Sequence, residues 1–289
     1  MSLSILTNIS AMQTHANLLK SSDAVSMAMQ RLSSGLRINN AADDAAGYAV
    51  SQGLTAQVNG LDQASRNVGD AISMVQTAQS SLNNVQSMLQ RVRELAVQYS
   101  NGDLSSTNKA AIQTEVDQLT NEIDRQRGAV AFNGQNLLNG SAGSGGAVTF
   151  QVGANGNDVL STTFQDIEGA KGIDSTVSGF CWSNVNGGTT GVSHVFDLSS
   201  GAISQIDNAI TNVSTLAATL GAVQNRLQYT ADAISATEEN LSASNSRIKD
   251  VDMASEMTRM TQEQILQQAG TAMLAQANSA PQMVLKLLG

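Results

Sequence analysis

The chain has 289 residues, of which only 13% are charged and 3% aromatic, and its net charge of −9 includes no cluster of Lys or Arg. This composition argues against nucleic acid and against an anionic membrane as partners. No run approaches the ~18 apolar residues of a membrane span. The single cysteine, Cys181, excludes an internal disulfide.

The N-terminal segment predicts a helix with an apolar stripe at Ile5, Ile9, Met12, Ala16 and Leu19, which then slips phase to Val25, Met29 and Leu32. Within its first thirty residues only Lys20 and Asp23 are charged. A solvated helix needs a charged outer face, so we expect other protein surfaces to cover this one on several sides. No basic segment leads into an apolar one, so no cleaved signal peptide is predicted, and taken alone this indicates a cytoplasmic protein.

The clearest periodic pattern is an unbroken alternation of three- and four-residue steps from Leu61 to Tyr99, with an apolar or aromatic residue at every position. It predicts a long helix with a coiled-coil seam. Asn101-Gly102-Asp103 ends it, and a second helix with the same rhythm follows from about Leu104 to 127. A short turn between two such helices predicts an antiparallel hairpin.

The middle of the chain, between Gly134 and Gly201, is rich in glycine and contains short β-prone runs at 147–152, 159–164 and 192–196. We interpret these runs as hairpins of a small outer module. A third helical seam then runs from Ile203 to Ile248, with polar residues at Gln224, Glu238 and Asn245 that set its register or mark where its partner stops.

The C-terminal segment repeats the pattern of the first. An apolar stripe runs through Leu266, Ala269, Met273 and Ala277 to Leu287, and from Thr261 onward only Glu263 and Lys286 are charged. We expect the two terminal stripes to pair with each other. The fold class is therefore mainly α, a long antiparallel helical bundle or coiled coil formed by both ends of the chain with a small β-hairpin-rich middle module.

No constellation of catalytic or metal-binding residues emerges. Asp43-Asp44 is interpreted as a turn or helix start rather than an acid–base pair. His15 and His194 lack metal-ligand spacing. No nucleophile elbow, phosphate loop or dinucleotide fingerprint is present, and the methionines sit mostly at helical spacing typical of adaptable packing. We predict no enzyme, no cofactor and no metal.

Arg91 and Leu95 lie one turn apart on the longest predicted helix, off the Leu89/Val92/Ala96 seam. An exposed pair of this kind is either ordinary helix surface or a subunit contact. Periodicity leaves both readings open.

Several segments resemble bacterial flagellins nearly letter for letter. Leu32–Gly47 (LSSGLRINNAADDAAG) is similar to their N-terminal signature, and Leu89–Gln98 (LQRVRELAVQ) and Phe132-Asn133-Gly134 to two further hallmarks. Gln264–Gly270 (QILQQAG) and Leu274–Asn278 (LAQAN) match the C-terminal one. The resemblance covers about 1–140 and 200–289, whereas the middle shows no such match.

The resemblance implies a structural subunit that polymerises with copies of itself into the flagellar filament for swimming. Residues 1–40 and 251–289 would form the inner filament core, 41–140 and 201–250 the surrounding helical bundle domain, and 141–200 an exposed variable module. It also implies unfolded export by the flagellar type III system, which accounts for the missing signal peptide. The location would be secreted and extracellular, and the partners an export chaperone, the filament cap and the hook-junction proteins.

Two groups of site residues are predicted. Assembly contacts are expected at the large apolar side chains of the termini, namely Leu18, Leu19, Leu266, Met273, Leu285, Leu287 and Leu288. By resemblance, Arg91, Leu95 and Glu115 match the surface that the flagellin-sensing Toll-like receptor recognises, which implies host innate receptors as partners of the monomer. The tail 284–288 resembles the segment read by cytosolic sensors.

Two other classes compete with this interpretation. A junction protein between hook and filament shares the terminal helices, and copy number in sheared filaments would separate it from a filament subunit. A signalling coiled coil is disfavoured because no membrane span is present and the middle is rich in hairpins. The Ser and Thr residues of 141–200 permit O-linked sugars, which composition does not establish.

Overall fold

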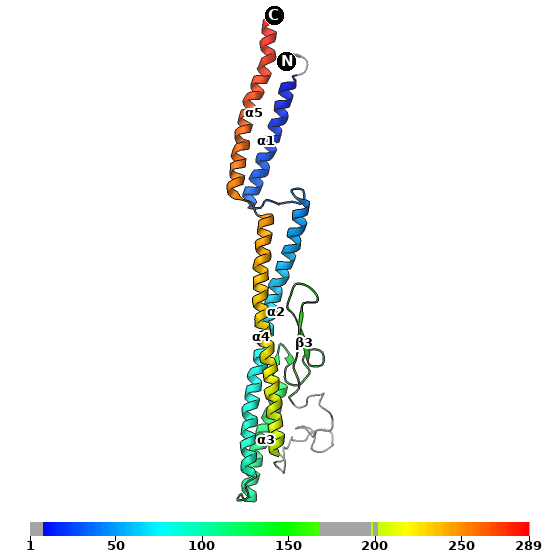
Figure 1. Cartoon of the computed structure of the whole chain (residues 1–289), viewed down its shortest axis with the longest axis vertical. Coiled ribbons are helices and arrows are strands. Elements are labelled where there is room, and N and C mark those ends of the chain that lie inside the picture. Colours follow the sequence, from blue (N-terminus) through cyan, green and yellow to red (C-terminus); the bar gives the residue numbers. More distant parts are fainter. Residues whose placement is uncertain (1–7, 168–197, 199–201, 289) are drawn as a thin grey trace. The chain divides into compact units, whose positions relative to one another are not determined.

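The computed structural model describes residues 8–167, 198 and 202–288, with side chains as far as Ser279. It is mainly helical, as predicted (Figure 1). The elements in chain order are α1 (Ile9–Ser34), α2 (Ala45–Tyr99), α3 (Ser106–Ala129), β1 (Ala131–Phe132), β2 (Gln135–Asn136), β3 (Ala147–Gln151), β4 (Val159–Thr163), α4 (Ala202–Lys249) and α5 (Met253–Leu288). Two compact units result, one from 1–58 with 239–289 and one from 59–238.

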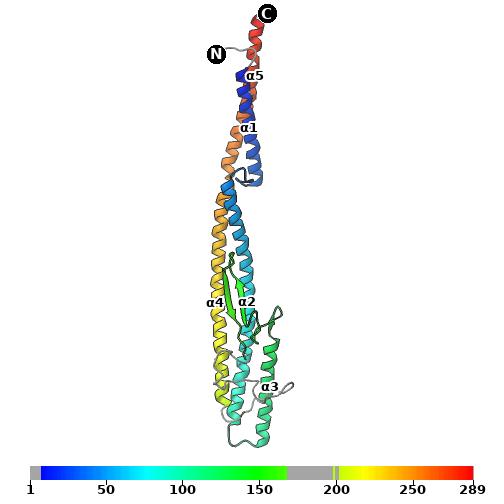
Figure 2. The same ribbon diagram turned by 90° about the vertical axis from the view of Figure 1, so that its right-hand side faces the viewer.

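The seam predicted on α2 is the core of the 59–238 unit. Every seam position from Leu61 to Ala96 is at most 8% exposed, and Tyr99 at its end is half-buried. Small Ala side chains alternate with larger ones, which lets neighbouring helices approach closely. On α4 the facing seam buries Ile206, Val213, Leu220, Leu227 and Ile234. Figure 2 shows α2, α3 and α4 together in this unit.

The predicted turn after α2 is present, and α3 returns alongside. Ser105 caps α3 by accepting a hydrogen bond from the backbone N–H of Asn108 (3.3 Å). Ile112 and Val116 of α3 join Val92 and Leu95 of α2 and Ile206 of α4 in one buried cluster. The hairpin is therefore held by a third helix.

The middle module begins with two hairpins. β1 and β2 pair through Phe132 and Gln135 around Asn133 (φ 48°) and Gly134 (φ 79°), the pair of positive φ angles that a two-residue hairpin turn requires. β3 and β4 pair antiparallel, which confirms the predicted hairpins at 147–152 and 159–164. The third β-prone run, 192–196, lies outside the described residues.

The β3–β4 hairpin lies against α2. Asn67 donates a side-chain hydrogen bond to the carbonyl of Gln151 (3.1 Å). A Cβ at Gly60 would come within 2.9 Å of the Ala154 Cβ, so only glycine allows this approach. Close by, the Arg127 guanidinium binds both carboxylate oxygens of Asp166 (2.8 and 2.7 Å).

In the other unit the two terminal helices lie side by side, as both ribbon views show (Figures 1 and 2). Near the end of the pair, the Asn8 side chain donates to the carbonyl of Ala277 (2.8 Å). This confirms that the terminal helices pair, although only part of each predicted stripe is covered by the pairing.

Candidate assembly surface and connecting segment

The contact between α1 and α5 is made largely by small and polar side chains. On α1 only Val25 and Ala28 are fully buried. On α5 the buried side chain is Glu256, 8% exposed, with a carboxylate oxygen 3.8 Å from the Arg31 guanidinium. A seam of this composition buries little apolar surface, so it accounts for only modest stability of the pair.

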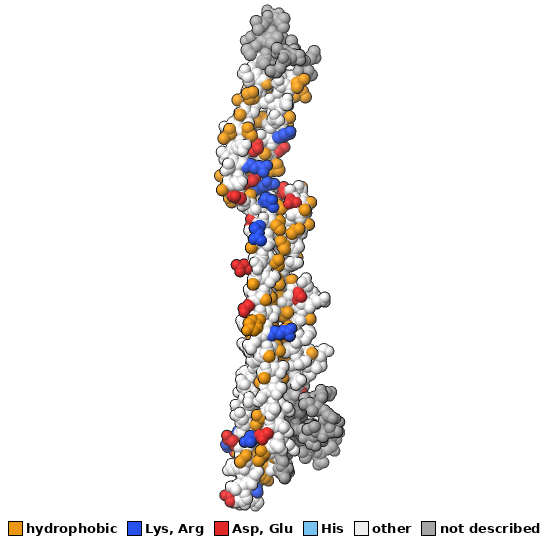
Figure 3. All heavy atoms as spheres, viewed as in Figure 1, with side chains coloured by type: hydrophobic (Ala, Val, Ile, Leu, Met, Phe, Trp, Pro, Cys, Tyr) orange, Lys and Arg blue, Asp and Glu red, His pale blue; other side chains and the backbone are white. Residues whose placement is uncertain are grey.

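Ten large apolar side chains of these two helices are instead exposed. The exposed set on α1 is Ile9 (70%), Met12 (68%), Leu19 (53%), Met27 (46%) and Met29 (50%), and on α5 it is Met253 (49%), Met257 (48%), Ile265 (61%), Leu266 (47%) and Met273 (61%). We call these ten side chains the outward apolar surface. On the face shown in Figure 3, hydrophobic side chains are spread over α1 and α5.

The prediction that the two apolar stripes pair with each other is confirmed only in part. Val25 of the first stripe is buried, and Leu32 and Ala277 are half-buried. Ile9, Met12 and Leu19 of the first stripe and Leu266 and Met273 of the second are all exposed. The contact instead includes polar and small side chains such as Ala28, which is 1% exposed. Gly270 of α5 faces the Leu18 side chain of α1, and a Cβ there would make an ordinary contact at 3.4 Å.

The residues predicted as assembly contacts therefore divide into three groups. Leu19, Leu266 and Met273 belong to the outward apolar surface, whereas Leu18 is half-buried against α5. The side chains of Leu285, Leu287 and Leu288 lie outside the described residues, although the backbone of α5 is helical to Leu288.

The segment joining α1 to α2 is tied to the segment joining α4 to α5. Gly35 ends α1 in the left-handed conformation (φ 73°), and its carbonyl accepts from the N–H of Val251 (3.0 Å). Arg37 donates through Nε (3.2 Å) and Nη2 (2.7 Å) to the carbonyl of Ile248, near the end of α4. A cation there satisfies a free carbonyl and complements the helix dipole. Sequence reasoning missed this role of Arg37.

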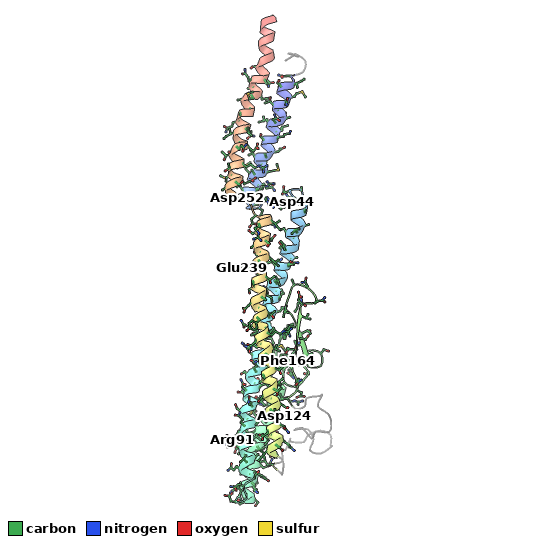
Figure 4. The ribbon with its side chains drawn as sticks, in the orientation of Figure 1. Asp44, Arg91, Asp124, Phe164, Glu239 and Asp252 are labelled. Atoms are coloured by element: carbon green, nitrogen blue, oxygen red, sulfur yellow. The ribbon has the colours of Figure 1, made fainter. Side chains whose placement is uncertain are left out.

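Asp43 and Asp44 organise the start of α2, as the helix-start interpretation expected. The Asp43 carboxylate accepts from the backbone N–H groups of Asn40 (2.9 Å) and Asn39 (3.0 Å), which lowers the pKa of Asp43. Asp44 accepts from the N–H of Gly47 (2.9 Å) and so caps α2. Figure 4 labels Asp44 at this end of α2 and Asp252 at the start of α5.

One polar cluster joins α2 to α4 beyond this segment. Ser51, 1% exposed, donates to the Asn245 side-chain oxygen (2.7 Å), and Asn245 donates to the Thr55 hydroxyl (3.1 Å). Asn245 was one of the polar interruptions predicted to set register or mark the end of the partner. The cluster favours a role in setting the register, because a slip by one turn would separate all three side chains.

Arg91, Leu95 and Glu115 lie close together, but they do not form one exposed surface. Arg91 binds Glu115 through Nε (3.0 Å) and Nη2 (2.8 Å) and also Glu94 (3.1 Å), and these carboxylates raise its pKa. Leu95 is only 2% exposed. The expectation of an exposed Arg–Leu pair is wrong, because residues off the α4-facing seam of α2 still face α3. Figure 4 shows where Arg91 lies on α2.

A metal-binding cluster does not appear in the part of the chain that the structure describes. Within it, no group of three or more His, Cys, Asp or Glu side chains could hold a metal ion. No helix among the described residues is long and apolar enough to cross a membrane. Cys181 and His194 lie outside the described residues.

Paired terminal helices that leave ten large apolar side chains exposed are typical of a structural subunit that assembles with other chains. Residues 5–143 match the family model of the bacterial flagellin N-terminal helical region, and residues 203–288 match that of the C-terminal helical region. The chain belongs to the bacterial flagellin family. It is thus a structural subunit of the flagellar filament, outside the cell, and not an enzyme.

Full-length relatives agree with this assignment. The chain is 43% identical to a flagellin of Halalkalibacterium halodurans and 42% identical to one of Bacillus subtilis, each over 97% of this chain and 98% of the relative. It is 42% identical, over the same shares, to the flagellar filament 33 kDa core protein of Treponema phagedenis. The crystal structure of Bacillus cereus flagellin aligns with a TM-score of 0.46 and 26% identity, covering 58% of this chain and 88% of that one.

Proposed function

We propose that the outward apolar surface of α1 and α5 is the contact through which subunits join in the filament. On this proposal, residues 1–40 and 251–289 form the inner core of the filament and 41–140 with 201–250 the surrounding bundle. Residues 141–200 form an exposed module. The observation that carries the proposal is the exposure of ten large apolar side chains on two helices that leave them uncovered within one chain.

The energetics favour self-association. Fully burying a Leu or Met side chain contributes ~1.5–3 kcal/mol, at about 25 cal/mol per Å². Since Leu19, Leu266 and Met273 are 53%, 47% and 61% exposed, covering each one contributes about 1 kcal/mol. Replacing all three by Ser therefore removes about 3 kcal/mol per subunit addition, or about two powers of ten in the critical concentration.

The test is seeded polymerisation of purified monomer, followed by electron microscopy and sedimentation. We expect the wild type to form long filaments and the triple Ser variant to remain in solution. Val159→Ser is the matched control, because Val159 is 48% exposed but lies on β4 of the outer module. Normal filaments from the triple variant would contradict the proposal.

The C-terminal residues provide a second test. Truncation from Val284 removes Leu285, Leu287 and Leu288, and we expect it to abolish polymerisation. The unfolding transition of the 61–248 bundle should be unchanged, because its core lies at Leu61–Ala96 and on α4. Loss of that transition together with polymerisation would mean that the tail stabilises the fold instead.

Export is the next step of the proposal. The chain leaves the cell unfolded through the flagellar type III system, accompanied by an export chaperone and received by the hook-junction and cap proteins. Family membership supports this route. The experiment is to assay the culture fluid of a strain lacking the export ATPase, in which the chain should remain inside the cell.

Recognition of the monomer by host innate receptors is proposed at Arg91, Leu95 and Glu115, and by cytosolic sensors at 284–288. Arg91 and Glu115 are exposed, whereas buried Leu95 contributes by holding α3 against α2. We expect Arg91→Ala to weaken receptor signalling by monomer. Arg93→Ala is the matched control, because Arg93 is also about half exposed and pairs instead with Asp207 (2.6 Å).

A further inference from the structure

The methionines of this chain are concentrated in its terminal helices. Of the 11 methionines, all but Met74 and Met88 lie in residues 1–58 or 239–289. In the 59–238 unit, Met74 is 4% exposed and serves as core packing, as the sequence predicted. In the terminal helices, six methionines are between 46% and 68% exposed, namely Met12, Met27, Met29, Met253, Met257 and Met273.

These six side chains form more than half of the outward apolar surface. An aliphatic surface of Leu and Ile would serve self-association equally well, but it would be chemically inert. Methionine adds one property, because its thioether sulfur is readily oxidised when solvent and oxidant reach it. These six sulfurs are not buried within the chain, since their side chains are about half exposed or more.

We propose that the six exposed methionines are a reversible oxidation site that controls whether a subunit can join the filament. In the forward step, the sulfur lone pair attacks hydrogen peroxide, one oxygen atom is transferred, the thioether becomes a sulfoxide and the peroxide is reduced to water. In the reverse step, a thiol-dependent reductase takes the oxygen, and two thiols become a disulfide as water is released.

The physical effect follows from the place of these residues. A sulfoxide is a strongly polar acceptor, and burying it without a donor is unfavourable. Oxidation therefore makes burial of the contact surface unfavourable. The 59–238 unit should keep its fold, because its two methionines are Met74, which is 4% exposed, and Met88, which is half-buried. In the filament the same sulfurs are covered, so the site acts on the free subunit alone.

This inference rests on the proposed function, and the experiment separates the two. Purified monomer is treated with hydrogen peroxide and then with dithiothreitol, which reverses oxidation to a disulfide or sulfenic acid at Cys181 but not a sulfoxide. Peptide mass spectrometry follows each methionine, and seeded polymerisation follows assembly. If untreated monomer does not polymerise, the proposed function fails before oxidation is considered.

We expect the six exposed methionines to be oxidised well before Met74 and the critical concentration to rise about tenfold or more. Hydrogen exchange of peptides from residues 59–238 should stay unchanged. Repair by methionine sulfoxide reductases of both stereospecificities should restore polymerisation. Filaments exposed to the same peroxide should show these methionines protected.

A variant with leucine at all six positions keeps the apolar surface and removes the sulfurs. It should polymerise equally well before and after peroxide. Loss of polymerisation by the oxidised leucine variant would overturn the inference, as would undiminished assembly of wild type carrying mapped sulfoxides. If the leucine variant does not assemble at all, repair of oxidised wild type decides: failure of reductases to restore assembly overturns the inference.

Discussion

Two glycines in the first turns of α2 should respond to alanine with opposite signs. At Gly47 a Cβ would lie 2.8 Å from the Ile38 Cδ1 and closer still to the Asp44 carboxylate that caps the helix. At Gly53, on the same helix, no atom lies within 4 Å of the Cβ position. The backbone of both is helical, so the difference lies in their surroundings.

The magnitudes follow from these contacts. Gly47→Ala displaces the Asp44 cap, which destabilises the helix start by about 1 kcal/mol. The added methyl also crowds Ile38, which is 2% exposed, at a further cost of ~1–3 kcal/mol. The higher helix propensity of Ala offsets about 1 kcal/mol. The net result is a loss of about 1–3 kcal/mol, whereas Gly53→Ala should gain ~0.5–1 kcal/mol.

The assay is hydrogen exchange of the monomer followed by mass spectrometry, on peptides covering residues 36–55. Gly47→Ala should speed exchange at the start of α2 by about tenfold or more, and Gly53→Ala should slow it a few-fold. Exchange of peptides from residues 59–238 in the same experiment should be unaffected in both. Equal protection in the two variants would refute the reasoning, because it would mean that Asp44 and Ile38 do not constrain this turn.

Three further predictions concern stability. Leu89→Ala, at a position 1% exposed, should lower the free energy of unfolding by ~2–5 kcal/mol in urea denaturation, whereas Leu19→Ala, 53% exposed, should leave the monomer within about 0.5 kcal/mol; equal losses would contradict the burial of the α2 seam. Asn245→Ala should cost about 1–3 kcal/mol, because it leaves the buried Ser51 hydroxyl without its acceptor; Asn225→Ala, at an exposed site on α4, is the comparison. Since the folded-state pKa of Asp43 is lowered, its contribution is present above the ordinary carboxyl pKa of about 4 and is lost as pH falls through the lowered value. Amide protection of Asn39 and Asn40, followed by nuclear magnetic resonance, should therefore decrease with acid, and Asp43→Asn should remove that pH dependence.

Local patterns in the chain were enough to predict most of its secondary structure. The seam from Leu61 to Ala96 is buried as its three–four spacing indicated, because a helix that long has one continuous face for its partners. The β3–β4 hairpin also follows from short-range chemistry. The cap at the start of α2 is also local, because Asp44 accepts a hydrogen bond from the N–H of Gly47, three residues later.

Which partner covers a given face was decided only by the tertiary arrangement. Periodicity shows that an apolar stripe will be buried, but it does not distinguish burial within one chain from burial against another. The contact between α1 and α5 therefore leaves the side chains of Leu19 and Met273 exposed to solvent. Leu95 shows the same limit, since a residue off the seam for α4 lies on the contact with α3. Long-range contacts such as Arg37 to the carbonyl of Ile248 leave no periodic trace, because they depend on two segments meeting in space.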